Sequence, residues 1–357
     1  MSFLQQAPQL SAAEAGRLAR DFYGLAASVS PLPSERDQNF LLISAGDLGT
    51  GGLGAVRYVL KIANATEDRA MLEAQNAAMA RVADPPTRRW RFGGTGRIAL
   101  CPHALPTRSG DLIAVAPGGV HFVRLVTYVE GVPLAEVRER TPALFESLGG
   151  AVGRLDRALD GFDHPAIHRD FHWDLARADA VIQEHLPRVT DPADRQIVER
   201  IARAALQAIE GHQPAFRRSA VHHDANDWNV LVSTPDTRSP NPESRTSNPE
   251  VVGIIDFGDM VHSWTVADPA VAVAYAMLDA ADPLRIAEAV IHGYQSEHPL
   301  LPPERAAVFP LACLRLCMSV CIAAWQQAQR AGDEYLAVSQ PPIRRTLPAL
   351  ATILEQR

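Results

Sequence analysis

The chain has 357 residues, 47% of them hydrophobic, so it can bury a substantial core, and its length suggests two domains or one bilobal unit. A formal net charge of -7 argues against nucleic acid as the main partner, because binding a phosphate backbone needs a basic face. The four cysteines and the lack of an N-terminal apolar segment favour a reducing cytoplasm. Apolar runs such as residues 270–278 are too short to cross a bilayer, so no membrane partner is expected.

The N-terminal segment predicts a helix followed by a hairpin. Residues 11–22 carry Ala, Leu and Phe at helical spacing and predict an amphipathic helix behind the first strand. A polar turn over residues 34–39 then separates two strands. The backbone N–H groups of this turn and the Ser34 hydroxyl can hold phosphate oxygens, so we assign Ser34 and Asn39 to phosphate binding. An ordinary surface hairpin fits the same residues equally well.

A glycine-rich stretch follows that invites two wrong interpretations. Gly49, Gly51, Gly54 and Val56 fit the pattern G-x-G-x-x-G-x-V. A dinucleotide-binding turn must open a helix, but the residues that follow are strand-like. A kinase glycine loop would need another strand and a turn before Lys61, which lies only seven residues past Gly54. The stretch is better interpreted as a flexible hairpin tip.

Lys61 is the single lysine among 34 Lys and Arg residues. In a chain so biased to arginine, a lone lysine suggests that a compact ammonium is needed at this position, although chance would also explain it. Its strand context is that of a lysine that reaches the phosphates of a nucleotide. Glu73, twelve residues on in a helix-forming segment, is the candidate partner that would orient the ammonium, with a solvated helix carboxylate as the alternative.

Three further strands, over residues 96–102, 111–116 and 121–129, complete the predicted antiparallel sheet. The chain then reaches a Gly- and Pro-containing hinge, where the backbone of Thr127 and Val129 can meet a nucleotide base. We therefore divide the chain into an N-lobe, residues 1–130, and a mostly helical C-lobe, residues 131–357.

The most informative stretch is VHHDANDWNVLV, followed downstream by VVGIIDFGDM. Asp224 is followed five residues later by Asn229, and the second apolar run delivers Asp256 within D-F-G. Phosphotransferases of the protein-kinase type arrange their site in this order: an aspartate receives the acceptor's proton, and an asparagine and a second aspartate hold metal ions. Two polar turns on a buried hairpin are the alternative.

Three other features of the C-lobe give no functional assignment. Residues 168–170 spell HRD, but Leu175 stands where a metal-binding asparagine is required. Residues 233–250 are rich in Ser, Pro and Asn and predict a disordered insert at a hairpin tip. Cysteines at 313, 317 and 321 fall on one face of an apolar helix and are expected to fill the core.

Asp227, Trp228 and Asp259 are candidates for binding an amine-bearing acceptor. Asp227 lies three residues after Asp224, and Asp259 lies three after Asp256. Carboxylates and an indole face suit a cation through charge pairing and cation–π contact. The alternative is that Asp227 caps a turn and that Asp259 pairs with an arginine of the C-lobe.

From about residue 28 to residue 278 the sequence resembles the aminoglycoside phosphotransferase and choline kinase group of small-molecule kinases. Within that group the segments LPSERDQNF, YVLKIAN, LEAQNAAM, FDHPAIHRDFHWDL, HHDANDWNVLV and GIIDFGDM look like hydroxylysine kinases. The resemblance implies an α+β, bilobal, protein-kinase-like fold.

The resemblance also implies roles for individual residues. Asp224 would be the catalytic base, Asn229 and Asp256 the ligands of Mg²⁺, and Lys61 a phosphate-binding residue. The family often has glycine before the catalytic aspartate, whereas this chain has His222-His223-Asp224, which leaves open the histidine that fills the motif position.

The leading functional hypothesis is a kinase that uses ATP or GTP to phosphorylate a hydroxyl of a small amino compound, hydroxylysine first. Homoserine, choline, ethanolamine or an aminoglycoside are alternative acceptors. A non-catalytic binding protein of kinase fold is the alternative from another class, which the presence of Lys61, Asp224, Asn229 and Asp256 disfavours. The sequence does not indicate the oligomeric state.

Overall fold

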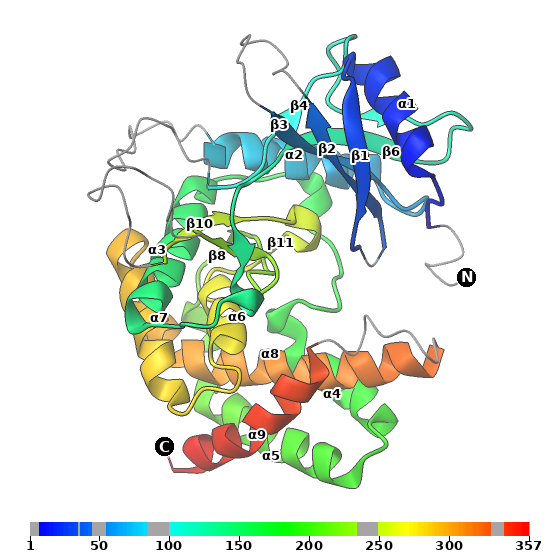
Figure 1. Cartoon of the computed structure of the whole chain (residues 1–357). Coiled ribbons are helices and arrows are strands. Elements are labelled where there is room, and N and C mark those ends of the chain that lie inside the picture. Colours follow the sequence, from blue (N-terminus) through cyan, green and yellow to red (C-terminus); the bar gives the residue numbers. More distant parts are fainter. Residues whose placement is uncertain are drawn as a thin grey trace. The chain divides into compact units, whose positions relative to one another are not determined.

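The computed structural model describes residues 7–34, 36–44, 55–83, 100–233, 249–329 and 339–356. The chain divides into two compact units, Met1–Val129 and Glu130–Arg357. The first is built on an antiparallel sheet and the second is mostly helical (Figure 1). The predicted α+β class, with a small antiparallel sheet followed by a helical region, is confirmed.

The first unit has two helices and six strands within its described part. In chain order these are α1 (Ala12–Tyr23), β1 (Ala27–Leu32), β2 (Gln38–Ser44), β3 (Val56–Ile62), α2 (Arg69–Ala83), β4 (Ala104–Leu105), β5 (Ala114–Val115) and β6 (Phe122–Thr127). The strand order is β1-β2-β3-β6-β4, with β5 also paired to β6, and all these pairs are antiparallel.

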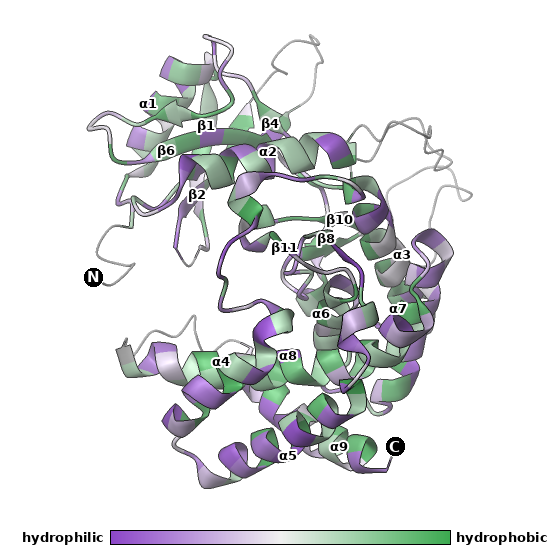
Figure 2. Ribbon diagram, turned by 180° about the vertical axis from the view of Figure 1, so that it is seen from behind, coloured by the Kyte–Doolittle hydropathy of each residue, from purple (hydrophilic) through white to green (hydrophobic). Residues whose placement is uncertain are grey.

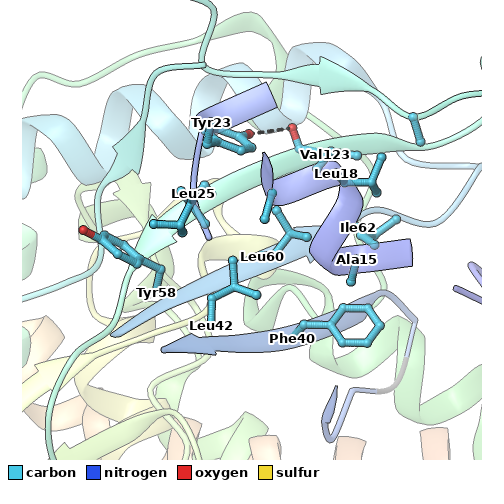
Figure 3. Close-up of a cluster of buried hydrophobic side chains, with 13 residues drawn as sticks. Ala15, Leu18, Tyr23, Leu25, Phe40, Leu42, Tyr58, Leu60, Ile62 and Val123 are labelled. Carbon is cyan, nitrogen blue, oxygen red and sulfur yellow. Dashed lines mark hydrogen bonds between the residues drawn. The ribbon is translucent and has the colours of Figure 1, made fainter. Parts of the chain in front are cut away.

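Helix α1 covers one face of this sheet, as its periodicity predicts. It begins at a capping box, in which the hydroxyl of Ser11 accepts from the N–H of Glu14 and the Glu14 carboxylate accepts from the N–H of Ser11. Gly24 ends it in the left-handed conformation, at φ 68°. Its apolar side chains pack on alternate residues of β2, β3 and β6 (Figure 3). The hydroxyl of Tyr23 bonds to the carbonyl oxygen of Val123 at 3.5 Å.

Lys61 lies on the opposite face of the sheet, because Leu60 and Ile62 point into the α1 core. Its register partners are Asn39 on β2 and Arg124 on β6. Since directly paired residues point to the same side, the three side chains share this face. It therefore brings two of the predicted phosphate-binding residues together.

The second unit contains short strands set among helices. Its strands are β7 (Val132–Pro133), β8 (Arg218–Val221), β9 (Val230–Val232), β10 (Val251–Ile254) and β11 (Val261–Trp264), and its α-helices are α3 (Pro142–Leu159), α4 (Ala178–His185), α5 (Pro192–Ile209), α6 (Ala267–Ala276), α7 (Pro283–Glu297), α8 (Pro302–Gln329) and α9 (Gln340–Glu355). The strands form two small antiparallel sheets, ordered β10-β9-β7 and β11-β8.

Helix α8 is the core helix of this unit and packs against α4, α5, α6 and α9 (Figures 1 and 2). By length and composition its Pro302–Ala328 segment could cross a membrane, but 94% of the apolar window is buried inside the fold, as in the core of a globular unit. Cys313, Cys317 and Cys321 are fully buried within it and form no disulfide, which confirms their prediction as core residues.

The structure corrects some strand boundaries. The predicted strand over 111–116 is only β5, and that over 121–129 is β6, which ends at Thr127. The sequence predicts a strand over residues 96–102, but residues 100–102 do not belong to a strand. The nearest strand is β4. The remainder of that segment, the glycine-rich residues 45–54 and the insert residues 234–248 lie outside the described residues.

Candidate active site

Two loops of the second unit meet at the ends of the β9–β10 hairpin. Strand β8 leads into the loop of residues 222–229, which ends as β9 begins, and β10 ends just before Asp256. Because β9 and β10 are antiparallel neighbours, the start of one lies beside the end of the other. The N–H of Ile255 donates to the carbonyl oxygen of Asn229 at 2.9 Å. The two halves of the sequence motif are thus brought together by one local hairpin.

Asp224 is held by donors on both carboxylate oxygens. Its Oδ1 accepts from the side-chain amide of Asn226 at 2.9 Å and from the guanidinium of Arg315 at 3.1 Å. Its Oδ2 accepts from the side-chain amide of Asn229 at 2.6 Å. Because Asn229 donates through Nδ2, its carbonyl oxygen Oδ1 is the atom that can bind a metal ion. The predicted base and a predicted metal ligand are therefore neighbours.

The surroundings of Asp224 disfavour the charged form of its carboxyl. Burial raises the pKa of its carboxyl well above the usual range, and the nearby carboxylates of Asp259 and Asp256 raise it further. Arg315 and Asn226 oppose that shift. The negative charge of these carboxylates favours a cation nearby.

His222 is the histidine whose ring joins the two loops. Its Nδ1 accepts from the N–H of Asp224 at 3.2 Å, so Nε2 carries the proton and donates to the carbonyl oxygen of Ile255, also at 3.2 Å. Burial lowers the pKa of this ring, which keeps it neutral. His223 adopts φ 67°, a left-handed conformation, and its ring lies beside the backbone of Trp173 and Leu175 instead.

Asp268 fixes this unusual backbone. Its two carboxylate oxygens accept from the N–H groups of His222, at 2.8 Å, and His223, at 2.5 Å. It lies in the first turn of α6 and is fully buried. Behind it, Asp156 of α3 accepts from the hydroxyl of Tyr294 at 2.6 Å, and burial together with Asp268 raises the pKa of Asp156 well above its usual range. Sequence reasoning missed Asp268, whose only signal is an acidic residue before an apolar helical run.

Asp256 also has a left-handed backbone, at φ 65°. Its Oδ1 accepts from the N–H of Gly258 at 3.3 Å, and the residue is exposed, as a metal ligand in an open site must be. The ring of Phe257 packs edge-on against His222, with centroids 4.8 Å apart. This packing anchors the loop that carries Asp256 beside the loop that carries Asp224.

The predicted acceptor residues differ in exposure. The Trp228 side chain is 44% exposed, whereas Asp227 is only 9% exposed. Burial raises the pKa of Asp227 to about 6, with Arg140 opposing the shift, and its carbonyl oxygen accepts from the N–H of Ala135 at 2.8 Å. Asp259 is half-buried. Their roles toward an acceptor stay predictions.

The predicted nucleotide-binding residues of the first unit lie on the sheet, on α2 and in the turn between β1 and β2. Lys61 and Asn39 share one sheet face, and Oδ1 of Asn39 is buried without a hydrogen-bond partner among the described residues. Glu73 pairs with Arg69 one turn earlier, with Nε to Oε1 at 2.9 Å, so its pairing with Lys61 stays a prediction. The Ser34 side chain is half-buried in the turn between β1 and β2.

The hinge residues are partly committed to the sheet. The N–H of Thr127 donates to the carbonyl oxygen of His103 at 3.0 Å, and the N–H of Tyr128 donates to that of Arg57 at 3.3 Å. Contact with a nucleotide base would therefore use the N–H of Val129 or the carbonyl oxygens of this segment. This assignment also stays a prediction.

Arg315 is the second residue that sequence reasoning missed. It lies on α8, is 2% exposed, and reaches the carboxylate of Asp224 across 91 residues of sequence. Its guanidinium carbon lies 4.4 Å from the ring centroid of Trp173 and 5.9 Å from that of Tyr275. The available signal was one arginine in an otherwise apolar helical run.

The fold and the Asp224, Asn229 and Asp256 constellation define a phosphotransferase of kinase-like architecture. Residues 28–307 match the model of the phosphotransferase enzyme family. Hydroxylysine kinase of Mus musculus is 31% identical over 344 residues, which cover 93% of this chain and 87% of that protein. The chain belongs to this phosphotransferase family, and it is a small-molecule kinase that phosphorylates a hydroxyl group, as the resemblance implied.

Solved structures share the fold. A microcompartment-associated aminopropanol kinase superimposes with a TM-score of 0.63 at 18% identity, covering 95% of each chain. Spectinomycin phosphotransferase, in complex with ADP and spectinomycin, superimposes with a TM-score of 0.61 at 11% identity, covering 98% of this chain and all of that one. At these identities the likeness shows a shared fold.

Proposed function

We propose that this kinase transfers the terminal phosphoryl group of ATP or GTP, with Mg²⁺, to the hydroxyl of a small amino-containing acceptor, hydroxylysine first. The observation that carries the proposal is the bonded pair of Asp224 and Asn229 beside Asp256. The identity of about 30% to hydroxylysine kinases over most of the chain supports the choice of acceptor.

In this mechanism Asp224 receives the acceptor's proton. The hydroxyl oxygen forms a bond to the terminal phosphorus of the nucleotide. The bond from that phosphorus to the bridging oxygen breaks, and the nucleoside diphosphate leaves. The raised pKa of Asp224 makes it a better proton acceptor than a solvated aspartate. Asn226 and Asn229 fix the plane of its carboxylate, so the accepting oxygen has a defined direction.

The metal would be held by Asn229 and Asp256, whose amide and carboxylate oxygens are ligands that Mg²⁺ prefers. Within the described ranges no three His, Cys, Asp or Glu side chains form a metal-binding group, so water and donor phosphates would complete the coordination. When bound, Mg²⁺ neutralises charge on the phosphates. Lys61 of the first unit is the residue that we propose to bind phosphate oxygens of the donor nucleotide.

The acceptor's amine would meet Asp259, Asp227 and Trp228. The carboxylate of Asp259 already acts on Asp224 electrostatically, which indicates that the two are close. The exposed indole of Trp228 offers a face for a cation. An amine held there would orient a flexible acceptor relative to Asp224.

The test is a nucleotide-consumption screen of the purified protein, with ATP and GTP each offered against hydroxylysine, homoserine, choline, ethanolamine, aminopropanol and an aminoglycoside. We expect the highest kcat/KM with hydroxylysine, and no consumption without Mg²⁺. A higher kcat/KM with another acceptor would reassign the substrate. Absence of turnover with every acceptor, with nucleotide still bound, would favour the non-catalytic binding protein.

A further inference from the structure

Arg315 is a buried charged residue in an otherwise apolar segment of α8. Residues 307–323 of α8 are otherwise almost all apolar and buried, and the arginine is itself 2% exposed. A guanidinium cannot lose its proton at any working pH, so its charge must be compensated inside the core. A buried arginine therefore needs partners, and these partners show what it does.

The partners of Arg315 lie at the active site. Nη2 donates to Oδ1 of Asp224 at 3.1 Å, and Nη1 donates to the carbonyl oxygen of Trp173 at 3.3 Å. The planar group rests on the Trp173 ring, with its carbon 4.4 Å from the centroid. The Tyr275 ring lies 5.9 Å from the same carbon, and Nε has no hydrogen-bond partner among the described residues.

The other donors to Asp224 come from its own loop. Asn226 and Asn229 lie two and five residues away, so their bonds move with the loop. Arg315 supplies the bond from a separate helix, and it is held in turn by Trp173. It therefore fixes the carboxylate relative to the core of the second unit, and not only relative to its neighbours in sequence.

We propose that Arg315 is a positioning residue for the reaction, and that through Nη2 it holds the Asp224 carboxylate in the direction needed to accept the acceptor's proton. This inference rests on the proposed function. It assigns to Arg315 an effect on turnover and none on nucleotide affinity, because its contacts are with Asp224, Trp173 and Tyr275, and none of these is a predicted nucleotide-binding residue. If the ion pair had a purely structural role, its loss would lower the melting temperature and leave turnover unchanged.

The test compares Arg315→Met and Arg315→Lys with the parent protein. A misplaced catalytic group costs on the order of 100-fold in rate, so Arg315→Met should lose about that much kcat while the KM for nucleotide stays within about twofold. Arg315→Lys keeps the charge but cannot bond both Asp224 and the Trp173 carbonyl as a fork does, so it should recover part of the loss.

Arg157→Met is the control for losing an arginine ion pair elsewhere in the second unit. Arg157 pairs with Glu297 at 2.7 Å and joins α3 to α7, so its loss removes an ion pair that does not contact Asp224. It should lower the melting temperature without changing kcat. Proteins with native circular dichroism and a cooperative melt are compared at a temperature well below each midpoint.

Three results would overturn the inference: a folded Arg315→Met with kcat within about threefold of the parent, a matching rise in nucleotide KM, or an equal loss of kcat in the Arg157→Met control. If Arg315→Met does not fold, Arg315→Lys decides: about tenfold lower kcat at unchanged nucleotide KM supports the inference, and parental kcat overturns it. These results are interpreted only if the parent protein is active. A parent protein that turns over no acceptor would overturn the proposed function and this inference with it.

Discussion

Asp227→Asn should stabilise the protein at neutral pH, because the native structure buries this carboxylate at a cost. Burial raises its pKa from 3.8 to about 6. A group whose folded pKa is raised contributes stability below its unfolded pKa and loses it as pH rises through the folded value. The full difference, about 2.2 pKa units, corresponds to about 3 kcal/mol at high pH. On the order of 2 kcal/mol of this is lost between pH 4.5 and 7.5.

The assay is urea unfolding of the parent and Asp227→Asn at pH 4.5 and 7.5. Asparagine does not titrate. The free energy of unfolding of Asp227→Asn, relative to that of the parent, should therefore increase by about 2 kcal/mol from pH 4.5 to pH 7.5. Asp279→Asn is the control: hydrogen bonding to Arg345 lowers the pKa of Asp279, so its contribution is complete above the usual carboxyl range and should stay level. A stability difference for Asp227→Asn that does not change with pH would refute the argument.

Three further variants test other parts of the account. Lys61→Arg should raise the KM for nucleotide and lower kcat, since the fork is larger and directs its donors differently; arginine as good as lysine would refute this. Asp259→Asn should raise KM for an amine-bearing acceptor about tenfold and leave the nucleotide KM unchanged, and a parallel rise of both would show a structural role. Gly293→Ala should cost about 1 to 3 kcal/mol in urea unfolding, because its Cβ would lie 1.9 Å from the carbonyl oxygen of Glu146; an unchanged midpoint would contradict that close packing.

The residues that sequence reasoning found are those whose chemistry is local. Asp224 and Asn229 lie in one loop, and the β9–β10 hairpin brings Asp256 beside them, so spacing and strand pattern were enough. Asp268 and Arg315 contact the same loop across 46 and 91 residues, distances at which no spacing rule applies. Their side chains stand in apolar helices, and only tertiary packing shows which polar group each one meets.

The first unit shows a similar limit. The strand context of Lys61 could be predicted from sequence, and in the structure it lies on the face opposite the α1 core, because side chains of a strand alternate. The partner of Glu73 could not be derived this way. In the structure Arg69, one helical turn earlier, pairs with that carboxylate, and a pair with Lys61 stays a prediction.

The measurement that tests the central claim most directly is the turnover of Asp224→Asn beside its nucleotide affinity. Asparagine keeps the shape of the side chain but cannot accept the proton as a carboxylate does. We expect kcat to fall by about two to four orders of magnitude with the dissociation constant for Mg²⁺-nucleotide nearly unchanged. Turnover within about tenfold of the parent would contradict the assignment of Asp224 as the catalytic base.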